Sequence, residues 1–236
     1  MDRQDRWRER YAAIRPGWTP TPHLYAALIA DRVDAGTRVL DIGCGHADLL
    51  ADVLAPAARV VGIDLDREAL RRNPTIRQAV VASAERLPFD DASFDLVLLA
   101  WVVEHLERPA SAFREMHRVL DRGGRVLFVT PNAWNYNAWL IRLVPNALHP
   151  FFTRRLYGRA AADTFPTRYR FNSPRRIDRV LSRIGFAKER IVLNGDPTYV
   201  AVTPWLFRLA TWMERLYDLP WLRRARVHIV AVFRKG

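Results

Sequence analysis

The residues best suited to chemistry lie in the segment RVLDIGCGHADLL, residues 38–50. An apolar run ends at Asp41, the glycines Gly43 and Gly45 flank Cys44, and a helix-like sequence follows. Glycine permits tight torsions and close approach of a ligand to the backbone. A turn that leads from a strand into a helix also presents unpaired N–H groups. The segment is therefore typical of a ligand-binding turn, although a tight turn without a ligand has the same pattern.

Two familiar kinds of glycine turn fit this segment poorly. A dinucleotide-binding turn has the pattern G-x-G-x-x-G, but the third position here is Asp48, a carboxylate where a pyrophosphate would lie. A phosphate-binding P-loop needs a Gly-Lys-Ser/Thr ending, which the sequence of this turn lacks. The acidic turn instead favours a cationic sulfonium that carries an amino acid and a nucleoside.

Four ordered segments resemble one family. VLDIGCGHADLL is similar to the first motif of class I S-adenosylmethionine-dependent methyltransferases, and VVGIDLD resembles their second-strand motif, whose acid is Asp64. ASAERLPFDDASFDLVLLAWVVEHL and VLDRGGRVLFVTPN resemble later segments of the small-molecule group, methyltransferase type 11, which includes ubiquinone-pathway enzymes. The resemblance covers residues 37–132 well and the rest of the chain only loosely.

The resemblance implies that the chain binds S-adenosyl-L-methionine. Asp41 and the backbone of the glycine turn would hold the methionine moiety, and Asp64 would accept hydrogen bonds from both ribose hydroxyls. Leu65 would pack on the adenine. The full set of implied cofactor-binding residues is Asp41, Gly43, Cys44, Gly45, Asp64, Leu65, Ser83, Ala84, Glu85 and Ala100.

The remaining implied contacts include two departures from the family pattern. Ser83, Ala84 and Glu85 would lie at the adenine edge, where Ser83 replaces the usual aspartate. The Ala100 carbonyl would lie near the methionine amino group. Ala47 replaces the third glycine of the first motif. We expect cofactor binding to survive both changes.

His105 is the candidate catalytic residue. Transfer of a methyl group from a sulfonium is an in-line displacement that depends mainly on positioning, and a base is needed only where the acceptor must lose a proton. His105 follows the predicted fourth strand and could remove that proton, or it could simply cap or pack a helix. Glu104 would orient His105 or line the pocket. No convergent set of metal ligands is expected.

Alternating apolar and helical patterns predict the fold. The sequence predicts strands at 37–42, 59–65, 76–82, 94–100, 125–131, 189–195 and 226–235. Between them it predicts helices at 46–55, 67–72, 109–120, 173–186 and 203–219, with Ser173 capping the fourth and Gly123-Gly124 ending the third. We therefore expect an α/β three-layer sandwich with a mostly parallel seven-stranded sheet and an antiparallel final strand.

The expected domain organisation is a single methyltransferase domain over residues 1–236. It would carry an N-terminal helical arm at 1–35, a helical cap insertion at 133–172 and an amphipathic helix at 203–222 before the last strand. Trp205, Leu209, Trp212 and Leu216 form one stripe of that helix. The aromatic rings of the cap would either bind a large apolar acceptor or form core.

Composition sets further expectations. The single cysteine excludes an internal disulfide and a cysteine-based zinc cluster. The N-terminus does not read as a secretory signal, and the longest apolar run, 96–103, is too short to span a bilayer. We expect a cytoplasmic protein. The net charge of +12 would attract nucleic acid or an anionic membrane, or would be only a solvated surface.

These observations predict methyl transfer to a hydrophobic or aromatic small molecule or lipid-like acceptor, on oxygen. One alternative is an RNA methyltransferase that uses the basic surface, and another is a cofactor-binding protein without catalysis. Enzymes that methylate nucleobase amino groups carry Asn/Asp-Pro-Pro-aromatic after the fourth strand. Residues 100–103 read Ala-Trp-Val-Val there, so a nucleic-acid partner is disfavoured. Peripheral contact with an anionic membrane stays open. Nothing in the sequence indicates an oligomeric state.

Overall fold

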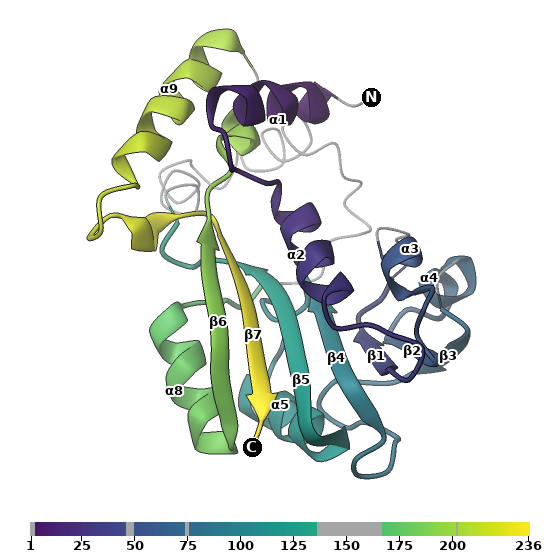
Figure 1. Cartoon of the computed structure of the whole chain (residues 1–236). Helices are drawn as coiled ribbons and strands as arrows, with labels where there is room; N and C mark the ends of the chain where they lie inside the picture. Colours follow the sequence, from purple (N-terminus) through teal and green to yellow (C-terminus); the bar gives the residue numbers. More distant parts are fainter. Residues whose placement is uncertain (1–2, 46–49, 74–75, 136–166, 202) are drawn as a thin grey trace, which may run out of the picture. The chain divides into compact units, whose positions relative to one another are not determined.

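The structure is a computed structural model that describes residues 3–45, 50–73, 76–135, 167–201 and 203–236 (Figure 1). The chain divides into two compact units. The sheet unit comprises Pro22–Pro131, Thr167–Val192 and Ile229–Gly236. The helical unit comprises Met1–Thr21, Asn132–Pro166 and Leu193–His228.

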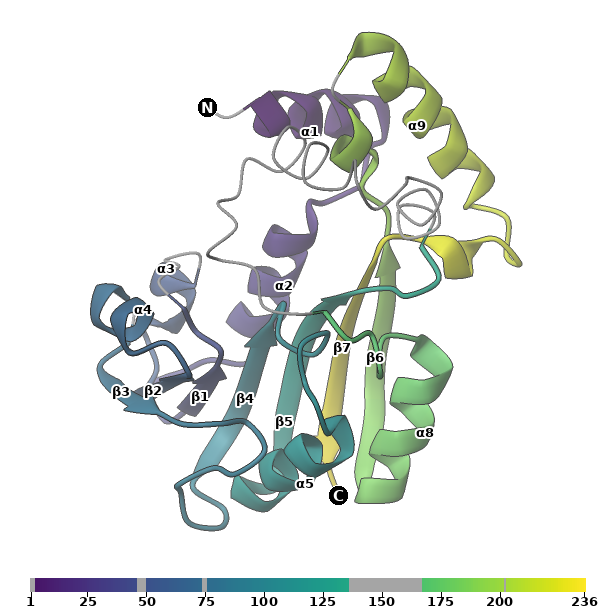
Figure 2. The same ribbon diagram turned by 180° about the vertical axis from the view of Figure 1, so that it is seen from behind.

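A seven-stranded sheet with the order β3-β2-β1-β4-β5-β7-β6 forms the centre of the sheet unit. Its strands are β1 (Arg38–Ile42), β2 (Arg59–Asp64), β3 (Gln78–Val81), β4 (Phe94–Ala100), β5 (Leu120–Pro131), β6 (Phe186–Asn194) and β7 (His228–Lys235). The pairs β1–β2, β1–β4, β2–β3 and β4–β5 are parallel. The arrow of β7 runs opposite to those of β5 and β6 (Figures 1 and 2). The predicted fold class is therefore confirmed, including the antiparallel final strand.

Apolar side chains fill both faces of this sheet. On one face, Tyr25 and Ile29 of α2 (Thr21–Ala30) and Leu54 of α3 (Ala51–Leu54) pack with sheet residues such as Val39 and Leu96. Phenylalanines join the sheet to α5 (Pro109–Val119) on the other face. The ring contacts there are Phe113–Phe128, Phe113–Phe171 and Phe128–Phe233. Both faces of the sheet are therefore packed against other parts of the unit.

Element boundaries lie within a few residues of the sequence prediction, and the clearest differences are at the junction of α5 and β5, at Ser173 and at the start of β6. Helix α4 is Arg67–Arg72 as predicted, with Asp66 accepting hydrogen bonds at its N-terminus. Helix α5 ends at Val119 rather than at the glycine pair, because β5 pairs with β4 from Leu120 onward. Ser173 precedes α8 (Pro174–Ile184), but its side chain makes no capping hydrogen bond. Strand β6 begins three residues earlier than predicted, at Phe186.

The helical unit is built from α1 (Arg3–Ile14), the 3-10 turns η3 (Pro197–Val200) and η4 (Arg223–Ala225), and α9 (Pro204–Leu216). Trp7 stacks on Phe207 with ring centroids 4.7 Å apart, and Tyr11 meets Trp18 edge-on at the same distance. Thr203 caps α9 by accepting a hydrogen bond from the Leu206 N–H. The contact between Trp7 and Phe207 joins α1 to α9.

Most of the predicted cap insertion at 133–172 lies outside the described residues, so its boundaries stay a prediction, as does the single-domain layout. The same holds for Ala47 and Asp48. In the described part of the chain, no helix is long and apolar enough to cross a membrane.

Candidate functional site

The predicted cofactor residues gather at one edge of the sheet. Strands β3, β2, β1 and β4 are neighbours and parallel, so the segments that follow them meet at the same carboxyl edge. These segments are 41–45, 64–65, 83–85 and 100–105. The strand order reverses between β1 and β4, and open parallel sheets bind ligands at such a point.

The glycine turn after β1 uses its two glycines differently. Gly43 has a φ of +66° and donates a hydrogen bond to the Ile63 carbonyl at 2.7 Å; a Cβ there would lie 2.3 Å from Val102 Cγ2. Gly45 has a φ of +51°, but a Cβ there would meet nothing within 4 Å. Gly43 therefore allows packing against the chain itself, whereas Gly45 leaves open space beside the backbone.

Asp64, at the end of β2, is held in a fixed orientation. Its Oδ2 accepts the Gly45 N–H at 2.9 Å, and its Oδ1 accepts the Asp66 N–H at 2.9 Å. A carboxylate has about four lone-pair sites, so each oxygen keeps capacity for another donor. Asp64 therefore ties the glycine turn to β2 and can still accept two hydrogen bonds from a ligand.

Asp41 is a buried carboxyl group, only 7% exposed. No described residue donates a hydrogen bond to it. Burial, and then the charge of Asp64, raise the pKa of Asp41 to about 7. Burial, followed by Asp41 and Asp64, also raises the pKa of Cys44, whose thiol is therefore neutral and a poor nucleophile. The site is thus an acidic pair that a cation or a proton would stabilise.

Two residues that the sequence analysis did not select support the turn. Asn73, 9% exposed, follows α4, and its Nδ2 donates to the carbonyls of Cys44 and Gly45 at 3.0 Å each. Gly62 lies in β2, where a Cβ would come 2.7 Å from the Cys44 sulfur. The Asn-Pro pair after helix 67–72 signals a turn at Asn73 but does not indicate these partners.

The segment after β3 is held mainly by its own chain. The Ser83 hydroxyl accepts the Glu85 N–H at 3.2 Å, and Ala84 is buried. The Glu85 carboxylate accepts the backbone N–H and the Nε–H of Arg108, both at 2.7 Å. Burial alone would raise the pKa of Glu85, but these Arg108 contacts outweigh it and lower the pKa. Leu65, by contrast, is 64% exposed and offers an apolar surface.

The turn after β4 carries His105. Ala100 is partly buried at the end of the strand, and the His105 N–H donates to the Val102 carbonyl at 2.9 Å. Glu104 is buried, and its carboxylate accepts the Thr130 hydroxyl at 2.7 Å. This bond fixes the backbone next to His105, which is itself partly buried. The catalytic role of His105 stays a prediction.

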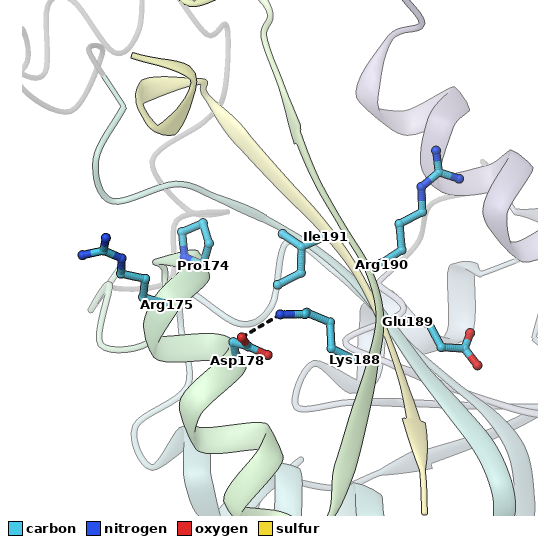
Figure 3. Close-up of a pocket in the computed structure, with 7 residues that line it drawn as sticks. All are labelled: Pro174, Arg175, Asp178, Lys188, Glu189, Arg190 and Ile191. Atoms are coloured by element: carbon cyan, nitrogen blue, oxygen red, sulfur yellow. Dashed lines mark hydrogen bonds and ion pairs between the residues drawn. The ribbon is translucent and has the colours of Figure 1, made fainter. Parts of the chain in front are cut away.

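Hollows elsewhere on the sheet unit lack a comparable arrangement. One, of about 350 Å³, lies between α8 and β6 and is lined mainly by charged side chains (Figure 3). There Lys188 Nζ donates to Asp178 Oδ2 at 2.7 Å, so the two charges compensate each other. Another hollow, of about 180 Å³, includes Thr37 and Gly124, at the opposite end of the sheet from the glycine turn. Among the described residues, no group of three or more His, Cys, Asp or Glu could hold a metal ion.

Comparisons with known proteins show which proteins this chain resembles. Residues 40–128 match the family model described as "Methyltransferase domain". A "Probable S-adenosylmethionine-dependent methyltransferase" of Mycolicibacterium smegmatis is 41% identical over 129 residues, which are 52% of this chain and 47% of that protein. A "Demethylmenaquinone methyltransferase" of Listeria welshimeri is 31% identical over 119 residues, which are 46% of this chain and 50% of that protein. The chain therefore spans about half the length of these relatives.

A solved structure supports the fold over more of the chain. Geranyl diphosphate C-methyltransferase from Streptomyces coelicolor, in complex with Mg²⁺, geranyl diphosphate and S-adenosyl-L-homocysteine, superposes with a TM-score of 0.60. The match covers 91% of this chain and 80% of that chain, at 14% sequence identity. At this identity the likeness shows the fold alone. Together, the comparisons confirm the predicted resemblance to class I S-adenosylmethionine-dependent methyltransferases.

Proposed function

We propose that this chain, whose residues 40–128 match a methyltransferase domain, methylates an oxygen of a hydrophobic or aromatic small molecule or lipid-like acceptor with S-adenosylmethionine as donor. The observation that carries the proposal is the Asp64 carboxylate, which the N–H groups of Gly45 and Asp66 orient. It lies at the end of the strand next to β1, whose own end carries the buried Asp41.

The residues of this edge fit the proposed donor. Asp41 is a buried carboxyl without a described hydrogen-bond donor, and burial of such a group is costly unless it is paired. The ammonium group of a methionine moiety would supply the missing donor and positive charge. The open space beside Gly45 admits a ligand against the backbone. Asp64 retains acceptors for two ribose hydroxyls, and exposed Leu65 offers an apolar surface for a flat base.

Each part of the site has a separate task in this proposal. When bound, S-adenosylmethionine supplies an electrophilic methyl group. Asp64 and the glycine turn fix its position, and Asp41 holds negative charge close to it. His105 accepts the proton that the acceptor hydroxyl loses. Glu104, through its bond to Thr130, keeps the backbone at His105 in place, and is a positioning residue.

The acceptor class rests on the aromatic character of residues 133–172 and on the named relatives. That segment is rich in tryptophan, tyrosine and phenylalanine, and its described Trp134 is 62% exposed. The Listeria relative is named for demethylmenaquinone, an apolar acceptor. Both observations support a large apolar substrate over a small polar one.

A labelling assay tests this function. Wild-type protein, methyl-labelled S-adenosylmethionine and a panel of phenols, quinols and lipid alcohols should give a product whose methyl group NMR assigns to oxygen. His105→Ala should lower kcat by about 10² to 10⁴ with donor affinity retained, because a general base contributes a factor of that order. The control is His23→Ala, which removes an exposed histidine of α2.

Three results of that assay would contradict the proposal. Label on carbon or nitrogen would exclude oxygen as the target. Full activity of His105→Ala would exclude its role as base. Label on added RNA, with none on the apolar panel, would favour an RNA methyltransferase.

A further inference from the structure

The exposed face of α9 is strongly apolar. Trp205, Leu209, Trp212 and Leu216 recur at helical spacing on one side of the helix, and their exposed fractions are 63, 45, 57 and 37%. The residues that follow α9 continue the apolar surface, with Leu219 and Trp221 43 and 71% exposed. We call these six residues the α9 apolar surface. A cluster of large exposed apolar side chains is a sign of an interaction site in a folded protein.

The opposite face of α9 is the buried one, and it carries polar groups. Its buried residues are Phe207, Ala210, Thr211 and Glu214. Glu214 is 1% exposed, and its carboxylate lies where a Cβ on Gly195 would project, 1.9 Å away. Phe207 stacks on Trp7 of α1. The helix therefore packs through its mixed polar face and leaves its most apolar face in solvent. Because α9 contacts α1 through Phe207, the exposure of the apolar face of α9 is not due to separation of the two helices.

Positive charge borders the α9 apolar surface. Arg208 and Arg215 lie beside the stripe by helical periodicity, and Arg223 and Arg224 follow Trp221; all four are exposed. None of the four side chains forms a salt bridge with a described residue. The exposed acid nearby in sequence, Asp218, is already paired with Arg15 and Arg226.

We propose that the α9 apolar surface binds an anionic membrane. An interfacial helix buries tryptophan and leucine just below the headgroups while arginines at its border contact anionic lipids, and the composition of this surface matches that arrangement. Tryptophan is also favoured at the membrane–water boundary. The 13 residues of α9 give an apolar stripe about 20 Å long. A straight stripe of this length suits the flat surface of a membrane better than a groove in a partner protein. The inference does not depend on methyl transfer, although membrane binding would bring the protein close to a lipid-like acceptor.

Vesicle binding tests the proposal with the full chain. Wild-type protein should co-sediment with vesicles of phosphatidylcholine containing one-third phosphatidylglycerol, more weakly at high salt, and much less with phosphatidylcholine alone. Trp205→Ser with Trp212→Ser should lower partitioning at least about tenfold, because two interfacial anchors are lost. Replacing any one of the four bordering arginines with glutamine should lower partitioning into anionic vesicles about fivefold. Brominated lipid should quench tryptophan fluorescence in the wild type more than in the double variant.

Trp134→Ser is the matched control, since Trp134 is 62% exposed in the same unit but lies outside α9. It should bind vesicles like the wild type. Circular dichroism and donor titration should be unchanged in the double variant, so that a failure of this proposal is distinct from a failure of the proposed function. Equal vesicle binding by the wild type and the double variant would overturn the proposal, as would no binding by either. A wild-type dimer that the double variant converts to a monomer, without vesicle binding, would instead identify a self-association surface.

Discussion

Each of the two units buries a titratable group, and the two groups differ in their partners. In the helical unit, His228 is 2% exposed, and its Nδ1 lies 2.9 Å from the Thr21 hydroxyl, which also accepts the Asn194 amide at 2.9 Å. Burial and then the charge of Arg8 lower the pKa of His228 to about 3. In the sheet unit, Asp41 is similarly buried, but no described residue donates to it.

This difference separates architecture from function. A buried polar group with partners in its own unit stabilises that unit, whereas a buried carboxyl without a donor destabilises the ligand-free fold. We therefore expect Asp41 to serve ligand binding and His228 to stabilise the fold. Substitutions that change packing, charge or hydrogen bonding in each unit test this difference between residues that stabilise the fold and residues that bind a ligand.

The largest effect should come from Gly43→Ala. The positive φ costs about 1 to 2 kcal/mol in a residue with a Cβ, and the contact of 2.3 Å with Val102 should add about 1 to 3 kcal/mol. Urea unfolding should therefore show a loss of about 2 to 5 kcal/mol. Adding Val102→Ala should restore the part due to the clash. Gly45→Ala is the control, because its Cβ meets nothing: it should cost only the backbone strain while still weakening donor binding. Equal losses in the free energy of unfolding for Gly43→Ala and Gly45→Ala would show that the two glycines do not differ in packing.

Asp41→Asn should stabilise the ligand-free protein and impair binding. The pKa of Asp41 lies above its ordinary value, so the folded protein holds the Asp41 proton more tightly than the unfolded chain does. The stabilisation of the folded state by this proton is complete below about pH 3.8 and is lost as pH rises through about 7. At pH values above 7 the variant should unfold with a free energy about 2 to 4 kcal/mol higher than the wild type, and less so near pH 5. Donor titration should show at least about a hundredfold weaker binding, since a buried charged pair is lost. A variant that is no more stable than the wild type at alkaline pH would show that Asp41 already has a partner.

His228→Asn should remove a pH dependence of opposite sign. The pKa of His228 is depressed, so the unfolded chain binds the additional proton, and stability is complete above pH 6.5 and falls toward the folded value of about 3. Between pH 6.5 and about 5, this group should cost the wild type about 2 kcal/mol. The variant, whose amide keeps a hydrogen-bonding atom near Thr21, should lack that slope in urea unfolding. A difference in stability between wild type and variant that stays constant from pH 6.5 to about 5 would contradict the buried neutral state of His228.

Asn73→Ala should have the smallest effect. The variant loses the hydrogen bonds to the Cys44 and Gly45 carbonyls and the one that Asn73 Oδ1 accepts from the Ile76 N–H, which together should cost about 1 to 2 kcal/mol of stability and about tenfold in donor affinity. Asn73→Asp is a stringent comparison, because it keeps the size of the side chain but replaces the donor with a charged acceptor. It should bind the donor no better than Asn73→Ala. Unchanged affinity in both variants would limit Asn73 to a role in folding.

Local patterns predicted the parts of the fold that depend on near neighbours. Strand β4 and helix α4 have the predicted bounds, because a continuous apolar run and an Asp66 cap with alternating charge define them locally. The acid at the end of β2 was predicted from the ordered motifs and lies beside the glycine turn. Parallel pairing of consecutive β-α units brings the predicted segments together without further information.

Contacts between distant residues could not be predicted from one sequence. Asn73 reaches carbonyls 28 and 29 positions away, and Glu85 pairs with Arg108 23 positions away. The periodicity of α9 predicted the stripe from Trp205 to Leu216 but could not decide that this side faces solvent. That outcome depends on the packing of Phe207 and Glu214 against other parts of the unit, which a helical pattern does not contain.

Calorimetric titration with S-adenosylmethionine of the wild type and Asp64→Ala tests the central claim most directly. The account predicts saturable binding to the wild type and at least about a hundredfold weaker binding to the variant, because two charge-assisted hydrogen bonds are lost. Asp66→Ala should bind nearly as well as the wild type, since Asp66 contributes its side chain to the start of α4 and only its backbone N–H to Asp64. Absence of binding to the wild type, or equal binding to a folded Asp64→Ala variant, would contradict the account.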